Sequence, residues 1–341
     1  MTPVRRLRIG IHSDLREHGE QAAVYRQTLD LFVRAEQLGF DTAWVRSYHF
    51  RRASGTPGLS FPGGLPSPFT FLGALAARTS RIRLGTSVVP LPLENVVRVA
   101  EDAAVLDAIS GGRLELGVSN GGQPPIAAAL GVALEPDRER KKAAYQRSLE
   151  ALRRILDGEP INGTAHELNP RASGLAGRIW ESALTEQTGR DSAARRNGVL
   201  IGTTQTVPAE VTGAAYHACL PRGAVPRVGL VVHVHLARDR RTGLAELAAD
   251  IATVYAWGKD WLPAADTLEQ QAAAINVHYG TPDQIAESIE SFPAFPYATE
   301  LQFSVGYGTT DPAQRREAVE AVAGQIAPQL GWAPQASAVR Q

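Results

Sequence analysis

Short apolar runs alternate along this chain with longer stretches in which apolar residues recur at every third or fourth position. Such alternation is typical of buried strands followed by amphipathic helices. Residues 81–122 show it most clearly, with the run Leu84–Val89, a helix that begins after the capping residue Asn95 and ends at Gly111, and a second run Arg113–Val118. Two strands joined by one helix in so short a span form a βαβ unit with parallel strands and a right-handed crossover.

The same alternation continues along the chain without a change in composition that would mark a domain boundary. Eight strands are predicted, each followed by a helix, which favours a single (β/α)8 TIM barrel over residues 1–330 with extended loops at its C-terminal face. A doubly wound sheet is the alternative, but it would need two halves that the pattern lacks. We expect a flexible tail at 331–341. The predicted strands are Leu7–His12, Asp41–Arg46, Leu84–Val89, Arg113–Val118, Ile179–Ala183, Gly198–Gly202, Arg227–Ala237 and Glu300–Val305.

Some segments between the strands do not follow this pattern. Residues 51–68 are rich in Gly, Pro and Ser and are too long for a simple connection, so we expect a lid over the barrel mouth. Residues 158–177 form a second connection without periodicity, and residues 191–197 are expected to form a short helix. Residues 259–279 favour neither helix nor strand.

Composition and charge narrow the class of protein. The 341 residues are 44% hydrophobic, and a formal net charge of zero with a pI near 7.1 argues against nucleic acid or an anionic membrane as partner. A single cysteine, Cys219, excludes an internal disulfide and suits a reducing compartment. Since the N-terminus lacks the apolar core of a secretory signal and no apolar run approaches the roughly 18 residues of a membrane span, we expect a cytoplasmic protein.

Several residues within 81–122 match a known family in type and order. The matching positions are Gly85-Thr86-Ser87, Glu101-Asp102, Leu106-Asp107 and Ser110-Gly111-Gly112-Arg113, followed by Leu-Glu-Leu-Gly-Val. With these residues the chain resembles the bacterial luciferase-like flavin monooxygenases, whose members are (β/α)8 barrels. A bare βαβ unit would be a weak signal, because many α/β proteins contain one.

The resemblance implies a two-component monooxygenase. Reduced FMN would arrive from a separate flavin reductase, oxygen would form a flavin hydroperoxide, and one oxygen atom would pass to a small organic substrate. The sequence contains neither the Rossmann G-x-G-x-x-G nor a P-loop, in agreement with a reductase on another chain. Two alternatives keep the fold, namely an oxidoreductase that uses the deazaflavin F420 and a non-catalytic flavin-binding protein. Homodimers are common in the family.

Catalytic candidates follow the second predicted strand, at the barrel face where active sites are built. His49 is the first, because an imidazole with a pKa near neutrality can move protons, and the phenol of Tyr48 can donate a hydrogen bond. The alternative is a histidine that holds the loop in place. The family usually has two consecutive histidines here, the first serving as base in luciferases. Tyr48 occupies that first place.

The resemblance also implies where a flavin would bind. A non-proline cis peptide expected between Ser87 and Val88 would lie beneath the flavin ring. The flavin phosphate would lie at the ends of the fourth and fifth strands, where Asn120 replaces the arginine of luciferases. A glycine, hydroxyl groups and a cation beside a helix start suit such an anion, although a solvated turn is the alternative. The cofactor candidates are Ser87, Val88, Ser119, Asn120, Glu181, Ser182, Thr185, Gly189, Arg190 and, after the sixth strand, Thr203.

Two other barrel chemistries are less well supported. His233 and His235 lie on one face of a strand, as in metal-dependent hydrolases, but those enzymes place the pair near the first strand and add further ligands. We therefore expect structural or pocket-lining histidines and no metal. A Schiff-base aldolase is disfavoured because Lys141, Lys142 and Lys259 are the three lysines and none is at a predicted strand end.

Overall fold

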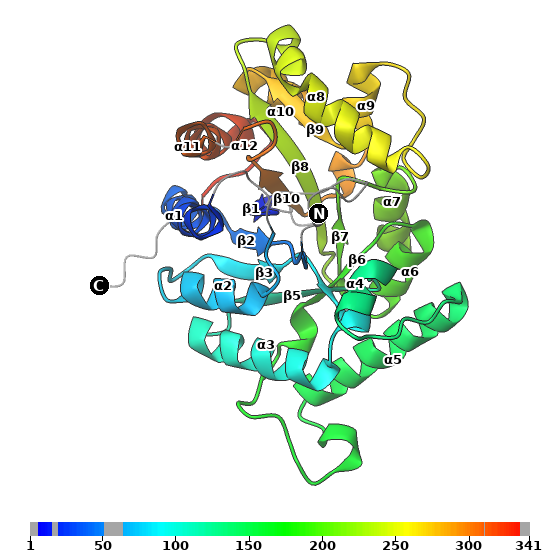
Figure 1. The fold of residues 1–341 in the computed structure, drawn as a ribbon. Helices are drawn as coiled ribbons and strands as arrows, with labels where there is room; N and C mark the ends of the chain where they lie inside the picture. Colours follow the sequence, from blue (N-terminus) through cyan, green and yellow to red (C-terminus); the bar gives the residue numbers. More distant parts are fainter. Residues whose placement is uncertain (1–5, 16–19, 51–63, 310, 335–341) are drawn as a thin grey trace.

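A closed ring of strands surrounded by helices makes up the molecule (Figure 1). The computed structural model describes residues 6–15, 20–50, 64–309 and 311–334. Eight parallel strands run round the ring in the order β10-β1-β2-β3-β5-β6-β7-β8, and pairing of β10 with β8 closes it, so the predicted (β/α)8 barrel is confirmed. The strands are β1 (Arg8–Ser13), β2 (Thr42–Val45), β3 (Arg83–Thr86), β5 (Leu114–Ser119), β6 (Ile179–Ser182), β7 (Gly198–Ile201), β8 (Val228–Leu236) and β10 (Glu300–Ser304).

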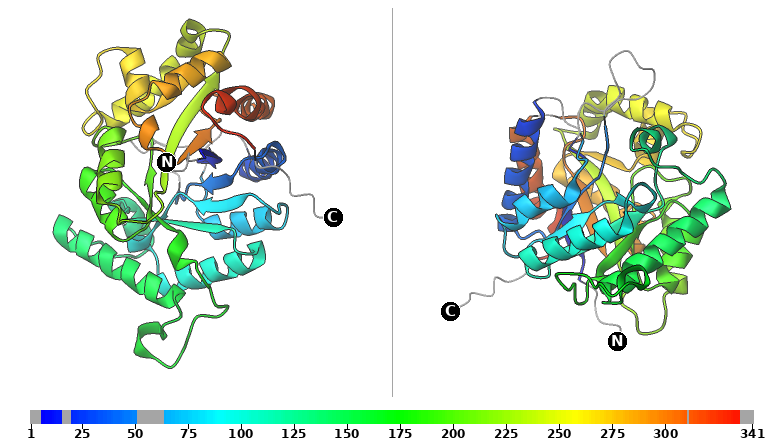
Figure 2. Two further views of the ribbon diagram at one scale, coloured as in Figure 1. Left: turned by 180° about the vertical axis from the view of Figure 1, so that it is seen from behind. Right: turned by 60° about the horizontal axis from the view of Figure 1, so that its bottom comes forward.

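Helices form a layer around the strands in both views of Figure 2. The caps predicted for α3 are present, since Asn95 Oδ1 accepts from the amides of Val97 and Arg98, and Gly111 ends the helix with φ +68°. No helix in the described ranges is long and apolar enough to cross a membrane. The helices are α1 (Gln21–Leu38), α2 (Pro68–Ala76), α3 (Val96–Ser110), α5 (Arg138–Leu156), α6 (Glu186–Ala194), α7 (Ala209–Cys219), α8 (Arg240–Gly258), α10 (Pro282–Glu290), α11 (Pro312–Ala321), the π-helical Val322–Ile326 and α12 (Ala327–Gln329).

Several short elements were missed by the sequence pattern. Residues 259–279 contain α9 (Leu268–Ala274) and β9 (Val277–Gly280), and β9 pairs with the second half of β8 beyond the ring. Helix α6 begins five residues before the expected 191, because Thr185 caps it and its first turn is polar, which hides it from an apolar pattern. The remaining short elements are β4 (Val89–Pro90), α4 (Pro124–Ala129) and the 3₁₀ turns η1 (Leu91–Leu93), η2 (Ile161–Gly163), η3 (Ala176–Arg178) and η4 (Phe295–Tyr297).

The start of the expected tail is packed against the barrel. Trp332 is buried, and its indole Nε1 donates to Asp41 Oδ2 over 3.1 Å. The packed part of the chain therefore extends to Trp332, because a tryptophan with a partner for its N–H has a place in the core. Residues 335–341 of the predicted tail lie outside the described residues, so their flexibility remains a prediction. Residues 51–63, most of the expected lid, lie outside the described residues, so the lid remains a prediction.

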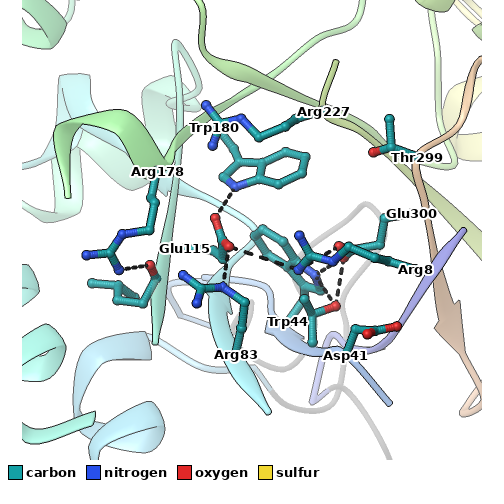
Figure 3. A network of polar contacts seen from close by, with 12 residues as sticks. Arg8, Asp41, Trp44, Arg83, Glu115, Arg178, Trp180, Arg227, Thr299 and Glu300 are labelled. Carbon is teal, nitrogen blue, oxygen red and sulfur yellow. Dashed lines mark hydrogen bonds and ion pairs between the residues drawn. The ribbon is translucent and has the colours of Figure 1, made fainter. Parts of the chain in front are cut away.

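The inside of the ring holds charges and aromatic rings, whereas its outside is apolar. Figure 3 shows the indoles of Trp44 and Trp180, whose ring centroids are 5.4 Å apart at an interplanar angle of 81°. Trp44 Nε1 donates to Glu300, and Trp180 Nε1 donates to Glu115 Oε2 over 2.7 Å. The Arg8 guanidinium lies 3.2 Å from Glu300 and 4.0 Å from Glu115. Each buried carboxylate therefore has an indole and a cation as partners, as buried charges require.

Glycines make room for these two tryptophans. A Cβ at Gly85 would lie 2.0 Å from the Trp44 ring, and one at Gly198 would lie 2.4 Å from the Trp180 ring. Trp44, Trp180 and Leu200 form one buried cluster, which we call the aromatic floor, and Val88 packs against it. The floor closes the barrel beneath the ends of the strands and leaves their C-terminal loops to form the mouth.

A methyl group in the floor should be costly. We expect Gly85→Ala to destabilise the fold by about 1–3 kcal/mol, the range for overpacking a core, because its Cβ would overlap a ring that glutamate and neighbouring rings hold in place. Gly73→Ala in α2 is the matched control: its Cβ meets nothing within 4 Å, and a helix-interior alanine should stabilise by roughly 0.5–1 kcal/mol. Thermal unfolding of both variants measures the difference, and equal melting temperatures would contradict the packing argument.

Candidate active site

His49 lies in the loop after β2 and is largely enclosed. Its side chain is 12% exposed, and its Nε2 is 3.8 Å from Glu94 Oε1. Burial lowers the pKa of His49 below its ordinary value of 6.5. The imidazole is therefore neutral at pH 7 and keeps one ring nitrogen able to accept a proton, as a general base must.

The neighbouring residue, Tyr48, is held by the backbone that returns to the barrel. Its amide donates to the carbonyl of Leu65 over 2.9 Å, and Gly64 packs so closely on its ring that a Cβ there would lie 3.0 Å away. Tyr25 adds a hydrogen bond of 2.7 Å to the Gly64 carbonyl. The loop therefore presents Tyr48 and His49 from a fixed backbone at the end of the second strand, where the sequence predicted them.

The cis peptide between Ser87 and Val88 is present, as the resemblance implied. Just before it, Thr86 Oγ1 accepts from the amide of Gly117 and donates to its carbonyl, both over 2.8 Å. The Ser87 amide donates to the carbonyl of Val45 over 2.7 Å. These bonds join the ends of β2, β3 and β5, and they place Val88 on the aromatic floor.

Ser119 and Ser182 come together at the ends of β5 and β6, and Asn120 follows Ser119 in the chain. Val118 pairs with Glu181 across the two strands, which brings the following residues, Ser119 and Ser182, next to one another. Ser119 Oγ accepts from the amide of Gly121 over 3.2 Å. Asn120 Oδ1 is buried and has no hydrogen-bond partner among the described residues. An unpartnered buried oxygen is unusual in a folded chain and is often found where a ligand supplies the missing donor.

The side chain of Glu181 points away from that group. It accepts from Tyr145 Oη over 3.0 Å, from Asn197 Nδ2 over 2.8 Å, and from both Nε and a terminal nitrogen of Arg195. Those partners come from α5 and from the segment between α6 and β7, and the carboxylate lies fully buried in the helix layer. Side chains alternate along a strand, so Ser182 lies on the face opposite to Glu181 and is the one of these two candidates that remains on the side of Ser119.

The candidates on α6 are not brought together. Thr185 caps the helix through its hydroxyl, which accepts from the Thr188 amide over 3.2 Å. Gly189 is a packing residue, because a Cβ would lie 2.7 Å from the carbonyl of Thr212 on α7. The guanidinium of Arg190 is exposed, pairs with Glu186 on its own helix and reaches Cys219. Thr203 is half-buried after β7. The Arg190 guanidinium, the cation expected at the phosphate, thus lies at the protein surface and is paired there with Glu186.

A different cation was missed by the sequence reasoning. Lys141, on the first turns of α5, donates from Nζ to the carbonyl of Gly122 over 3.3 Å, in the loop that continues from Asn120. The sequence does not indicate this contact, because Lys141 is far from any strand end. The neighbouring Lys142 pairs instead with Asp191 on α6. The ammonium places a positive charge beside the loop that carries Asn120.

The histidines of β8 line the opposite part of the ring without forming a metal site. His233 stacks on Tyr307 with ring centroids 4.7 Å apart, and His235 Nε2 lies 2.8 Å from Glu246 on α8. No group of three or more His, Cys, Asp or Glu side chains in the described part of the chain is arranged to hold a metal ion. His12 is a further histidine that the prediction passed over; it is buried at the end of β1, with Nδ1 3.8 Å from Asp14.

A serine, a histidine and an asparagine also line up beside β9, outside the mouth. His278 Nδ1 lies 2.8 Å from Ser288 Oγ, and its Nε2 lies 2.9 Å from Asn276 Oδ1, next to a cavity of about 280 Å³. Burial, helped by the charges of His233 and Arg240, lowers the pKa of His278 to about 3. So weak a base cannot take a proton from a serine at neutral pH, and we interpret the trio as a buried hydrogen-bond network.

Comparison with known proteins identifies the class to which this site belongs. The family model described as luciferase-like monooxygenase matches residues 8–295. The chain therefore belongs to the luciferase-like monooxygenase family, as its sequence resemblance indicated.

The similar proteins include enzymes whose names give different cofactors, FMN in one and F420 in another. The chain is 36% identical over 158 residues to 4-hydroxyprotoasukamycin monooxygenase of Streptomyces nodosus subsp. asukaensis, covering 43% of this chain and 39% of that protein. It is 36% identical over 127 residues to an F420-dependent glucose-6-phosphate dehydrogenase of Kineococcus radiotolerans, covering 37% and 34%. The oxygenating constituent of 3,6-diketocamphane monooxygenase from Pseudomonas putida, in complex with FMN, has a TM-score of 0.72 at 18% identity over 95% of this chain and 98% of that one. The matches thus span less than half the length of the two curated relatives.

Proposed function

We propose that this protein is a two-component monooxygenase that uses reduced FMN and oxygen to oxygenate a small organic substrate. The observation that carries the proposal is the group of polar atoms at the ends of β5 and β6: the hydroxyls of Ser119 and Ser182 and the Lys141 ammonium. Hydroxyl donors beside one cation suit a phosphate, and the apolar Val88 on the aromatic floor suits a flat ring.

When bound, reduced FMN would supply the two electrons with which oxygen is split between the product and water. The residues of the chain would bind it, exclude water and move a proton. Lys141, Ser119 and Ser182 would hold the phosphate, and Val88 would support the ring. His49, neutral because of its burial, would accept a proton from the substrate. A separate reductase would deliver the reduced cofactor, and a homodimer in the cytoplasm is the assembly that we propose.

The alternative is an F420-dependent oxidoreductase of the same fold, which the similarity to the Kineococcus radiotolerans dehydrogenase favours. The cofactor that the protein binds distinguishes the two functions. We expect anaerobic titration of the purified protein to show tight binding of reduced FMN and weak binding of reduced F420. Binding is measured by the quenching of the fluorescence of the floor tryptophans. Tight binding of F420 alone would establish the alternative. Binding of neither would leave the chain without the proposed chemistry.

The same titration tests the phosphate site. Lys141→Ala should weaken FMN binding about tenfold or more, since a hydrogen bond to a charged group contributes about 1.5–3 kcal/mol. Riboflavin, which lacks the phosphate, should bind the variant and the parent equally. Arg190→Ala is the matched control, because it removes a cation of the neighbouring helix that pairs with Glu186. Should Arg190→Ala weaken FMN and Lys141→Ala leave it unchanged, the phosphate would lie on α6.

A further inference from the structure

Glu94 is the charged side chain that faces His49. Its Oε1 lies 3.8 Å from His49 Nε2, and within the described parts of the chain no other ion pair is formed by either residue. The Nε2 atom is itself buried and makes no hydrogen bond to a described residue. At 3.8 Å the two atoms are just beyond hydrogen-bond distance, and catalytic contacts often shorten only when a substrate is bound.

Glu94 comes from a rigid part of the chain. It follows η1, whose Leu91 and Leu93 are both buried, and its amide donates to the Leu91 carbonyl over 3.1 Å. The next residue, Asn95, caps α3. His49, by contrast, stands in an irregular loop after β2. Because His49 Nε2 makes no hydrogen bond to a described residue, a carboxylate held between a packed turn and a capped helix can fix the orientation of the imidazole on its backbone.

Among the described residues, the other charges near Glu94 do not compete for it. Arg98, one turn along α3, pairs with Glu101 and also reaches Asp102. Asp102 is a like charge, and together with the larger effect of burial it raises the pKa of Glu94. Burial acts in the opposite direction on His49. Each group alone is thus disfavoured in its charged form, and each is the partner that would stabilise the charge of the other.

We propose that Glu94 is a positioning residue for His49: it turns Nε2 toward itself, leaves Nδ1 available to the substrate and raises the basicity of the imidazole. A carboxylate that accepts from one ring nitrogen selects the tautomer in which the other nitrogen is unprotonated, and it stabilises the imidazolium that forms after proton transfer. The inference rests on the proposed function for the role of His49, but the contact itself is testable without any reaction.

Histidine NMR of the full-length protein tests the contact directly. The protein has eight histidines, and the His49 signal is assigned by its loss in His49→Gln. In Glu94→Gln we expect His49 to titrate about one pH unit lower than in the parent, because an opposite charge within about 4–6 Å favours the protonated form. Glu94→Asp should restore part of the difference. Glu101→Gln removes a carboxylate of α3 that pairs with Arg98, and it should leave the titration unchanged.

Kinetics give the second readout. In Glu94→Gln we expect kcat to fall about tenfold with little change in KM, and the acidic limb of the pH–rate profile to move to lower pH with the histidine. An unchanged His49 titration in a folded Glu94→Gln protein would overturn the inference, even if activity fell. A lowered titration in a protein that oxygenates no substrate would support the contact while refuting the proposed function.

Discussion

His49→Ala lowers kcat of the oxygenation by about 10²-fold or more, the loss expected when a general base is removed. The melting temperature should stay close to that of the parent, because His49 lies in a loop after β2 and not in a strand or helix of the core. Its ring neighbour is Phe50, which is itself 53% exposed. Steady-state kinetics with saturating reduced flavin, beside thermal unfolding of both proteins, measures the two effects separately.

The pH dependence gives the prediction a sign. A base must be unprotonated, so activity is lost as the pH falls through the pKa of His49. Burial lowers that pKa, and the acidic limb of kcat/KM should therefore lie below pH 6.5 in the parent and disappear in His49→Ala. An unaltered rate, or a variant that fails to fold, would instead show that His49 holds its loop in place.

Local patterns were sufficient to predict the barrel. All eight ring strands overlap the predicted ranges, because each carries a short apolar run bounded by turn residues. The pattern failed where an element was too short or too polar to show periodicity. Helix α9 has seven residues and is fixed by a capping box between Thr267 and Gln270, and Trp332 packs onto the barrel through contacts distant in sequence.

The candidate site was predictable in position but not in orientation. The sequence placed His49, Ser119 and Ser182 at strand ends, since that follows from the fold alone. It could not show that Glu94 faces His49 across 45 positions of the sequence, or that Lys141 rather than Arg190 approaches the end of β5. Those facts depend on how helices pack, and strand periodicity carries no information about them.

The floor links fold to function. A ring of eight strands is normally filled by branched aliphatic side chains, whereas here two tryptophans and paired charges fill it beneath the mouth. Rigid rings held by Glu115 and Glu300 leave little freedom for Val88, which rests on them. We infer that the floor fixes the depth to which a flat cofactor can enter.

Glu181→Ala is expected to destabilise the protein by about 3 kcal/mol or more, the range for removing one partner of a buried ion pair. The variant would leave the Arg195 guanidinium, the Tyr145 hydroxyl and the Asn197 amide without their shared acceptor. Burial, followed by the charge of Glu181, raises the pKa of Tyr145 well above its ordinary value, so the phenol stays protonated and remains a hydrogen-bond donor. Without Glu181 this buried donor would have no acceptor, and the variant would bear the full cost of its desolvation.

Ser182→Ala is the matched control, one residue along the same strand and on its other face. It should melt close to the parent but bind FMN about tenfold more weakly, because its hydroxyl would contact the phosphate and not the core. Calorimetric unfolding with FMN titration of the folded fraction separates the two variants. The reverse result, with Glu181→Ala stable and deficient in FMN binding, would mean that the carboxylate serves the cofactor rather than the helix layer that encloses it.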